Sequence, residues 1–250
     1  MSPRKVCFFT ILATTALVSL VALPVFAQSG SLYLPVQTKN PKVLAAGKVL
    51  VASRALGDPH FVHTVVLLVH FDAQNVVGLV LNRRTEVPLS RVFEHVKQAK
   101  DRTDPVYLGG PVEMPSVFAL LQSPAKVDGA DHVFGDVYMI SDKPLFEKSL
   151  STQRDPRQFH VYLGYAGWTN EQLKKEVELG AWFIFPGDVS TVFNTDPESL
   201  WPQMIGKTEL EMARERSGKA TMAVVSLLPI VASPWTNPLP PASMRKSLGK

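Results

Sequence analysis

The residues best suited to chemistry are three histidines that follow Asp58, namely His60, His63 and His70. Two imidazoles three residues apart can reach one metal ion if the chain turns helically between them, and an imidazole near a carboxylate can also transfer protons. This spacing is common and supplies no third ligand, so we expect His60 and His63 at the surface and predict no metal site. His70 shares the parity of the apolar residues in its predicted strand, which favours a hydrogen-bonded, half-buried imidazole.

No other catalytic arrangement is visible. The chain has no Gly-x-Ser-x-Gly elbow, and the run Gly109-Gly110-Pro111 is neither a phosphate-binding loop nor a dinucleotide fingerprint. Pro111 also lacks the backbone N–H that an anion would use. Cys7 is the single cysteine and lies in a segment that we expect to be removed, which leaves no thiol for a disulfide, a nucleophile or a metal. We therefore expect a protein that is not an enzyme and needs no cofactor.

The charge distribution argues against a nucleic-acid surface. The formal net charge of the 250 residues is +4, of which Arg4 and Lys5 supply two, leaving +2 for the rest. Lysine and arginine are scattered along the chain and are not interleaved with aromatic residues. We therefore do not expect nucleic acid as a partner.

Residues 1–27 are typical of a Sec-type signal peptide. Arg4 and Lys5 supply the positive start, residues 6–23 the apolar segment, and residues 25–27 a small-residue cleavage site. Cleavage there predicts a periplasmic or secreted protein with no membrane span in its mature form. The alternatives are a chain anchored in a membrane by an uncleaved N-terminal helix and a cytoplasmic chain.

Apolar runs rich in β-branched residues predict the first strands, after an extended lead-in at 28–46. These runs are 48–53, 64–71 and 76–82, and residues 72–75 suit a tight hairpin between the last two. Further strands are predicted at 106–108, 117–121 and 133–140, the last with a bulge at Gly135. Helices are expected after Pro88 and Asp142, from Asp196, and from Thr208 to near Gly218. Residues 219–250 form an expected C-terminal extension.

The stretch 159–186 is the most informative part of the chain. Its first five residues alternate in the manner of a half-buried strand, with His160 and Tyr162 on the polar side. The glycines in 164–168 then predict a turn. Thr169, with Gln172 three residues on, predicts a capping box and a helix, and a strand follows at 181–185. Strands mixed with isolated helices favour an α+β fold.

Several short motifs in the right order resemble the YqgE/AlgH family over most of the chain. They are Asp58-Pro59 with Phe61, Gly78 to Arg83, Gly109 to Val112, Leu163 to Trp168 with Gln172-Leu173, Glu176 and Trp182, and Val192-Phe193 with Leu200-Trp201. The resemblance implies an α+β fold in which a bent, pseudo-barrel β-sheet is flanked by several helices, here at 47–218. It implies no established enzymatic activity, although one branch of the family is described as a transcriptional regulator.

The chain departs from the family pattern in three places. The family's Asn-Arg pair is usually followed by proline, whereas Arg84 follows here and adds a charge. Family members are typically cytoplasmic, so a signal peptide argues against a regulatory role. The segment after Gly218 extends beyond the usual pattern.

The matching residues that follow predicted strands suggest a site, because loops at one edge of a bent sheet can converge. These candidates are Asp58, Asn82, Arg83, Gly109, Gly110, Gly164, Tyr165, Gly167 and Trp168. Their structural interpretation is that the glycines serve tight turns, Asp58 caps a backbone donor and Trp168 fills the core. Their functional interpretation is that Asn82, Arg83 and Trp168 frame a shallow pocket for a small anion or for a partner's peptide.

These observations favour a periplasmic or secreted, non-catalytic binding or accessory module. Its expected partner is an unknown protein or a small anionic ligand. A cytoplasmic transcriptional regulator of the AlgH type is the alternative hypothesis. An enzyme with a histidine-centred site is the third.

Overall fold

The computed structural model describes residues 38–151, 155–193 and 196–227. The predicted signal peptide therefore lies outside the described residues, as do the first part of the lead-in and the end of the C-terminal extension. Every described residue belongs to one unit of the chain, residues 35–250.

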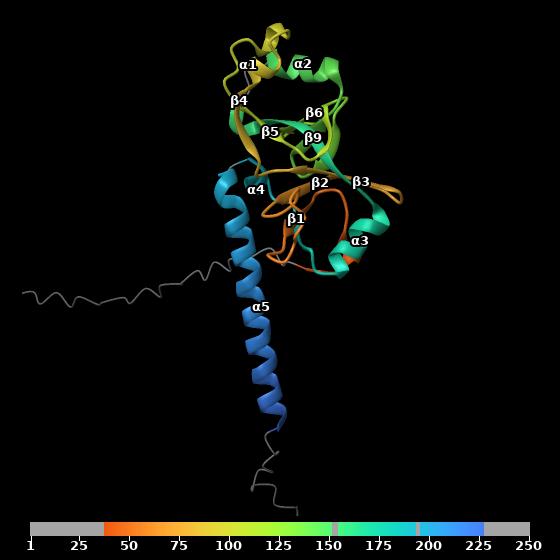
Figure 1. Cartoon of the computed structure of the whole chain (residues 1–250), viewed down its shortest axis with the longest axis vertical. Helices are drawn as coiled ribbons and strands as arrows, with labels where there is room; N and C mark the ends of the chain where they lie inside the picture. Colours follow the sequence, from red (N-terminus) through yellow and green to blue (C-terminus); the bar gives the residue numbers. More distant parts are fainter. Residues whose placement is uncertain (1–37, 152–154, 194–195, 228–250) are drawn as a thin grey trace, which may run out of the picture. The chain divides into compact units, whose positions relative to one another are not determined.

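Strands and helices alternate irregularly along this unit (Figure 1). The strands are β1 Lys48–Ala52, β2 Val65–Phe71, β3 Asn75–Val80, β4 Arg84–Pro88, β5 Pro105–Leu108, β6 Val112–Gln122, β7 Asp131–Phe134, β8 Val137–Ile140, β9 Phe159–Thr169 and β10 Trp182–Pro186. The helices are α1 Leu89–Val92, α2 Lys143–Ser151, α3 Asn170–Glu178, α4 Val189–Phe193 and α5 Pro197–Leu227, with 3-10 turns η1 Pro41–Val43, η2 Lys97–Ala99 and η3 Pro156–Gln158.

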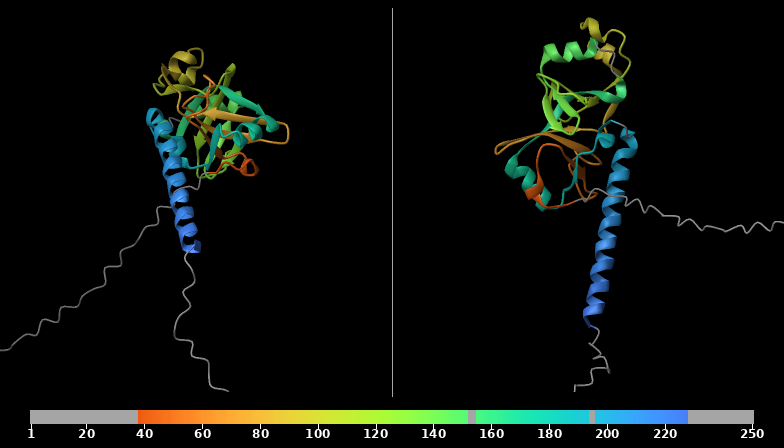
Figure 2. Two further views of the ribbon diagram at one scale, coloured as in Figure 1. Left: turned by 60° about the horizontal axis from the view of Figure 1, so that its bottom comes forward. Right: turned by 180° about the vertical axis from the view of Figure 1, so that it is seen from behind.

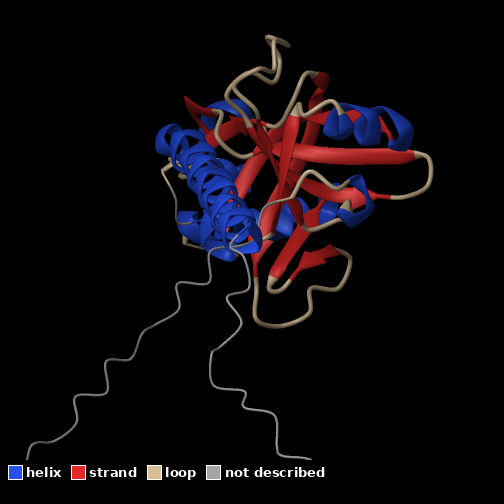
Figure 3. Ribbon diagram, turned by 90° about the horizontal axis from the view of Figure 1, so that it is seen from below, coloured by secondary structure: helices blue, strands red, loops and turns tan. Residues whose placement is uncertain are grey.

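All of these strands join one strongly curled sheet, which confirms the predicted α+β fold. Its main order is β10-β1-β2-β3-β9-β6-β8-β7, and the side pair β4-β5 attaches to β9. Every pairing is antiparallel except that of β5 with β9. Seen from below, the strands cross in the interior and the helices lie outside them (Figure 3).

The curl brings the two ends of the strand order together. A Cβ atom placed on Gly47, just before β1, would lie 2.9 Å from Cβ of Phe134 in β7. A Cβ atom on Gly187, just after β10, would lie 3.0 Å from the Phe134 ring. Glycine at both positions therefore lets β7 approach the loops that flank β1 and β10. The end of the lead-in also pairs with the sheet, because Thr38 and Ile184 of β10 exchange two backbone hydrogen bonds of 2.8 and 2.9 Å.

β9 is one continuous strand, so the turn predicted at 164–168 is wrong. Residues 159–163 pair with β6 on one side, while 161–163 pair with β5 on the other. After Gly164, whose φ is +67°, residues 166–169 pair with β3. The glycine therefore bends the strand from one partner to the next without ending it.

The faces of β6 and β9 belong to two different hydrophobic clusters. Phe159 and Val161 pack with helices α1 and α2, whereas Tyr162 points to the larger cluster formed with β1, β2 and β3. Side chains of a strand alternate between its faces, so a strand that is buried on both sides needs apolar or satisfied residues at every position. The prediction that 159–163 is half-buried is therefore wrong, because Tyr162 has no exposed surface. In Figure 1 and in the opposite view at the right of Figure 2, α1 and α2 remain together at the same end of the sheet.

The helix after Asp196 corrects two predictions. α5 runs unbroken to Leu227, so no second helix begins at Thr208 and none ends near Gly218. The Thr208 hydroxyl donates to the Ile205 carbonyl inside the helix at 2.6 Å and does not cap a new one. Helix α5 is fixed by Trp201, whose indole N–H donates to the Ala52 carbonyl of β1 at 2.8 Å.

Two shorter segments also differ from prediction. Residues 133–140 are not one strand but the hairpin β7-β8, in which Gly135 adopts φ +47° in the tight turn with Asp136. The helix after Pro88 is only the single turn α1, and η2 follows it.

The local caps and the first hairpin are confirmed. Oδ1 of Asp72 accepts the N–H groups of Gln74 and Asn75, each at 2.7 Å, and so closes the β2-β3 turn. The Asp142 carboxylate caps α2, and the Thr169 hydroxyl caps α3. The reciprocal half of the predicted capping box is not formed, because the Gln172 side chain donates to Glu176 instead, at 3.1 Å.

No helix among the described residues is long and apolar enough to cross a membrane.

Candidate functional site

The three histidines that follow Asp58, namely His60, His63 and His70, do not form a metal site. His70 is hydrogen-bonded to Asp72 at 2.9 Å, as expected, but its side chain is exposed because a β-bulge follows Leu68. His63 lies against the ring of Trp201, with ring centroids 4.1 Å apart. Within the described residues, no group of three or more His, Cys, Asp or Glu side chains is placed to hold a metal ion.

Asn82 holds two strand ends together. Its side-chain oxygen accepts the N–H of Val65 at 2.8 Å, and its amide nitrogen donates to the His63 carbonyl at 2.9 Å. Asp58 acts locally in the same way, because its Oδ1 accepts the N–H of His60 at 2.8 Å. Arg83 is half-buried, and its carbonyl accepts the N–H of Leu108.

Three glycines allow two backbone segments to cross. We call Gly109, Gly110 and Gly164 the glycine crossing. A Cβ atom on Gly110 would overlap the backbone of Tyr165, and one on Gly109 would overlap the Gly164 carbonyl. A Cβ atom on Gly164 would lie 2.7 Å from the Gly110 carbonyl. Glycine is therefore required at these three positions, because the two backbone segments approach too closely for a side chain.

Trp168 is part of the core. Its ring stacks on Phe61 with centroids 5.3 Å apart, and only 5% of the residue is exposed. The Glu176 carboxylate accepts the indole N–H of Trp168 at 3.2 Å and that of Trp182 at 2.9 Å. Glu176 thus satisfies both buried indoles from helix α3.

The predicted site residues do not converge on one pocket. Trp168 pairs with Val76 near the start of β3, whereas Asn82 and Arg83 follow its end. A strand rises about 3.3 Å per residue, so Asn82 and Trp168 lie on the order of 20 Å apart. Tyr165, Gly167 and Trp168 do share a shallow hollow of about 470 Å³. A binding role for any of the nine residues stays a prediction.

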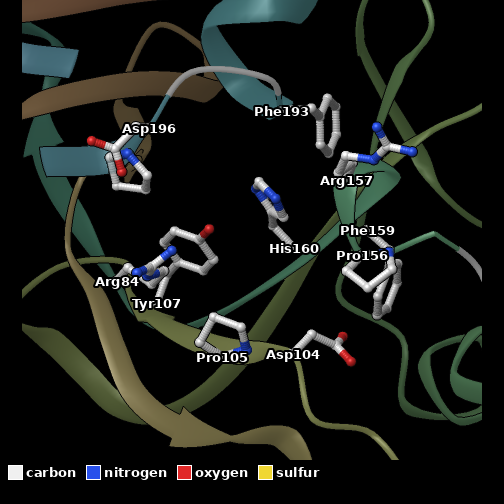
Figure 4. A pocket seen from close by; sticks show the side chains of 11 residues that line it. Arg84, Asp104, Pro105, Tyr107, Pro156, Arg157, Phe159, His160, Phe193 and Asp196 are labelled. Atoms are coloured by element: carbon white, nitrogen blue, oxygen red, sulfur yellow. The ribbon is translucent and has the colours of Figure 1, made fainter. Parts of the chain in front are cut away.

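A larger cavity lies elsewhere, and we call it the His160 cavity. Its volume is about 630 Å³, and Figure 4 shows the His160 side chain projecting into its centre. Strands β4, β5 and β9, turn η3 and helices α4 and α5 contribute to it. The lining residues are Arg84, Asp104, Pro105, Tyr107, Pro156, Arg157, Phe159, His160, Phe193, Asp196 and Pro197.

Aromatic rings place His160 between two elements. The imidazole stacks on Tyr107 of β5 at 4.8 Å and lies 5.1 Å from the Phe193 ring of α4. Tyr107 in turn contacts Tyr162 at 5.2 Å. The parallel pairing of β5 with β9 sets this ladder, because it puts Tyr107 opposite Tyr162 and next to His160. Such contacts restrict the imidazole to one orientation.

Burial keeps His160 neutral. Desolvation lowers the pKa of His160 from 6.5 to about 4, although the Asp104 charge and the Val192 backbone act in the opposite direction. Its Nδ1 is buried and has no hydrogen-bond partner among the described residues, and the same is true of the Tyr162 hydroxyl. Burial likewise raises the pKa of Tyr107, against the opposing charge of Arg84. At neutral pH, His160 and Tyr107 therefore contribute neutral polar groups to the wall of the cavity.

Most of the charged side chains around the cavity are already engaged. Arg102 donates to both carboxylate oxygens of Asp104, at 2.8 and 2.5 Å, in a largely buried pair. Arg157 is paired with Asp155 at 2.8 Å. Asp196 caps helix α5 by accepting the Ser199 N–H at 3.2 Å. The Arg84 guanidinium makes no hydrogen bond or ion pair with any described residue.

The comparisons with known proteins agree with this fold. The family model DUF179, described as AlgH-like, matches residues 49–213. The chain belongs to the AlgH-like family. A relative from Streptomyces avermitilis, named UPF0301 protein, is 34% identical over 67% of this chain and 88% of its own length. Another UPF0301 protein, from Azoarcus sp. strain BH72, is 29% identical over 66% of this chain and 89% of its own length.

Two solved structures are also similar to this chain. The solution structure of the AlgH protein from Pseudomonas aeruginosa is 26% identical, with a TM-score of 0.52, over 75% of this chain and 95% of that one. A crystal structure of a protein from Corynebacterium diphtheriae shares the fold, at 24% identity and a TM-score of 0.52, over 64% of this chain and 85% of that one. The family's function is uncharacterised, so the AlgH-like assignment indicates no catalytic role.

Sequence reasoning missed the residues that build the His160 cavity. Tyr107 lay in a short predicted strand, and His160 was assigned to the polar face of another. Arg84 was noted only as a departure from the AlgH-like pattern. The available signal was the combination of a histidine and tyrosines within strands that are otherwise apolar, which indicates polar groups inside a core.

Proposed function

We propose that this protein is a non-catalytic binding module whose ligand site is the His160 cavity. The observation that carries the proposal is the buried Nδ1 of His160, which has no partner among the described residues. An unpaired buried polar group costs about 1–3 kcal/mol of stability, so a native structure that retains one calls for an explanation, and a functional role is one such explanation. The cavity of about 630 Å³ also falls within the size range of small-molecule sites.

The chemistry of the lining favours binding over catalysis. The described lining contains no serine, threonine, cysteine or lysine that would serve as a nucleophile. An imidazole with a pKa of about 4 is a weak base at neutral pH, and the flanking rings of Tyr107 and Phe193 restrain it. Of the two partners expected from the sequence, a small anionic ligand fits a cavity of this size better than a protein surface does.

A fragment titration followed by NMR tests the site. Small ring-bearing anions added to the ¹⁵N-labelled protein are expected to shift the amide signals of Tyr107, His160 and Phe193. The shallow hollow around Gln172 and Gly167 is the internal control, and its signals are expected to stay in place. Shifts confined to the hollow would overturn the proposal. So would substrate turnover by the purified protein that is lost in His160→Ala.

We also propose that the mature protein acts in the periplasm or after secretion. The support is the residue pattern of 1–27, with its positive start, apolar segment and cleavage site. The N-terminus of the protein recovered from separated cell fractions tests it. A chain that begins near Gln28 outside the cytoplasm is expected, and a cytoplasmic chain that keeps Met1 would overturn this location.

A further inference from the structure

We propose that Arg84 makes the His160 cavity selective for a small monocarboxylate that carries a flat ring. This inference rests on the proposed function and names the ligand class of the same site. It follows from which charges around the cavity are already neutralised, from what Arg84 contacts, and from the shape of the remaining walls.

Arg84 is the cation of the described lining that remains available. Arg157 is held by Asp155 through bonds from Nε and Nη2, and Arg102 behind the wall is held by Asp104. The Arg84 guanidinium has no hydrogen bond or ion pair with any described residue. A guanidinium presents its N–H groups as a planar fork that matches the two oxygens of a carboxylate.

The pairing of β4 with β5 places Arg84 at the edge of the cavity. Strand β4 pairs with β5 so that Arg84 lies directly opposite Tyr107. The Arg84 charge acts on the Tyr107 phenol, and Figure 4 shows the two side chains next to each other on one side of the cavity. A carboxylate bound to Arg84 would therefore lie beside the phenol, whose hydroxyl is a second possible donor.

The other walls suit a flat, uncharged body. They consist mainly of aromatic rings and proline rings, contributed by Tyr107, Phe193, Pro105, Pro156 and Pro197. Aromatic faces and edges attract a ring in offset or perpendicular contact, and proline offers a rigid apolar surface. A ligand ring can therefore occupy the space that the Arg84 fork leaves.

The remaining charges favour one negative charge on the ligand. Asp104 and Asp196 also line the cavity. Asp104 is already paired with Arg102, and Asp196 caps helix α5. A dianion would meet the Arg84 cation and the Asp196 carboxylate, which has no ion pair with any described residue. Like charges at close range in a partly desolvated site repel strongly, so a phosphate is disfavoured relative to a carboxylate.

Three matched probes test the selectivity by calorimetric or NMR titration. Benzoate carries the ring and one charge, benzamide carries the ring without a charge, and phenyl phosphate carries the ring with a larger charge. A charge-assisted, bidentate hydrogen bond to Arg84 is expected to give benzoate about a tenfold or greater advantage in affinity over benzamide. Phenyl phosphate can also bind the guanidinium fork, but its second charge is repelled by the Asp196 carboxylate, so we expect it to bind more weakly than benzoate. The Tyr107 and His160 amide signals should report the binding.

Two variants separate the role of Arg84 from general positive charge. Arg84→Ala is expected to lower the affinity for benzoate to that for benzamide, whereas Arg84→Lys should retain part of the difference. Arg157→Ala is the matched control, since it also removes an arginine from the rim but one already paired with Asp155, and it should change benzoate affinity by less than about twofold.

The outcomes distinguish this inference from the proposed function. If no probe shifts the cavity signals, the His160 cavity is not the ligand site and both proposals fail. If the three probes bind there equally and Arg84→Ala changes nothing, the cavity binds ligands but the selectivity inference is wrong. Because the probe series is measured on the unaltered protein, it decides the matter even if an Arg84 variant folds poorly.

Discussion

The glycine crossing and the His160 cavity both lie along β9, and they differ in how their polar groups are paired. At the crossing and its neighbour Asn82, side chains and backbone are packed or hydrogen-bonded within the protein. At the cavity, the Nδ1 of His160 and the guanidinium of Arg84 have no hydrogen-bond partner among the described residues. A group whose bonds are complete inside the protein has little left for a ligand. The comparison therefore assigns a structural role to the crossing and supports the proposal that the cavity is the ligand site.

The largest expected effect on the free energy of unfolding comes from adding a methyl group at the glycine crossing. In Gly110→Ala the new Cβ would overlap the backbone of Tyr165 and the N of Ala166, so β5 and β9 would have to separate. We expect the free energy of unfolding to fall by about 3 kcal/mol or more, as for other substitutions that force backbone apart. Urea unfolding followed by circular dichroism measures it.

Gly57→Ala is the matched control for this substitution. Nothing lies within 4 Å of a Cβ at Gly57, so its stability should stay close to that of the unaltered protein. A loss of less than about 1 kcal/mol in Gly110→Ala would show that the two strands can move apart, and that the crossing is not a fixed structural feature.

The second prediction concerns the pH dependence of stability at the cavity. The pKa of His160 is about 4 in the folded protein and 6.5 in the unfolded chain, so between these values the unfolded chain binds more protons. Stability should therefore fall as the pH falls from 6.5 to about 4, by about 3 kcal/mol at 1.36 kcal/mol per pKa unit. His160→Phe removes this titration, and unfolding curves across that range measure the difference.

An exposed histidine gives the control for the pH experiment. The side chain of His95 is 94% exposed, so His95→Gln should keep the pH dependence of the unaltered protein. The acidic groups with lowered pKa, such as Asp72 at about 2, are shared by all three proteins, so their contribution cancels when the three pH dependences are compared. If His160→Phe has the same pH dependence as the unaltered protein, the imidazole is hydrated in the folded state and the cavity is not as dry as its burial implies.

The third prediction removes a completed set of hydrogen bonds. Asn82→Ala leaves the N–H of Val65 and the carbonyl of His63 without their partner. We expect a loss of about 2 kcal/mol in the free energy of unfolding, because the N–H of the buried Val65 left unpaired costs about 1–3 kcal/mol, whereas the exposed His63 carbonyl can be hydrated. Asn82→Asp retains the acceptor for Val65 and should lose less. Equal losses in the two variants would contradict the assignment of Oδ1 as the acceptor.

The elements that were predicted well depend on neighbouring residues. The Asp72 turn and the Thr169 cap are formed by side chains that bond backbone groups two or three residues away, so their residue types and spacing suffice. The course of β9 beyond Gly164 was missed because it depends on pairing with β3, a strand far away in the sequence. The glycines signalled a special backbone, but not whether the strand would turn or bend.

The site was harder to predict than the fold for the same physical reason. Arg84, Tyr107, His160 and Phe193 come from four separate segments, and only the parallel pairing of β5 with β9 and the position of α4 bring them together. The alternation pattern also placed His160 and Tyr162 toward solvent, since it does not show that helices cover the second face of a sheet. The motif residues that a family resemblance highlights were more easily found, and they proved to support the backbone.

The smallest expected effect on stability is that of Arg84→Ala, and it makes the comparison with Asn82 sharpest. Arg84 and Asn82 are two residues apart, yet the Arg84 side chain is exposed and has no hydrogen bond or ion pair with any described residue. Surface substitutions without such partners change stability by less than about 0.5 kcal/mol, so the Arg84→Ala protein should unfold at nearly the same urea concentration as the unaltered one. A loss as large as that of Asn82→Ala would mean that the guanidinium has an internal partner in the folded protein. Arg84 would then belong with the structural residues of the crossing, and its availability to a carboxylate would have to be given up.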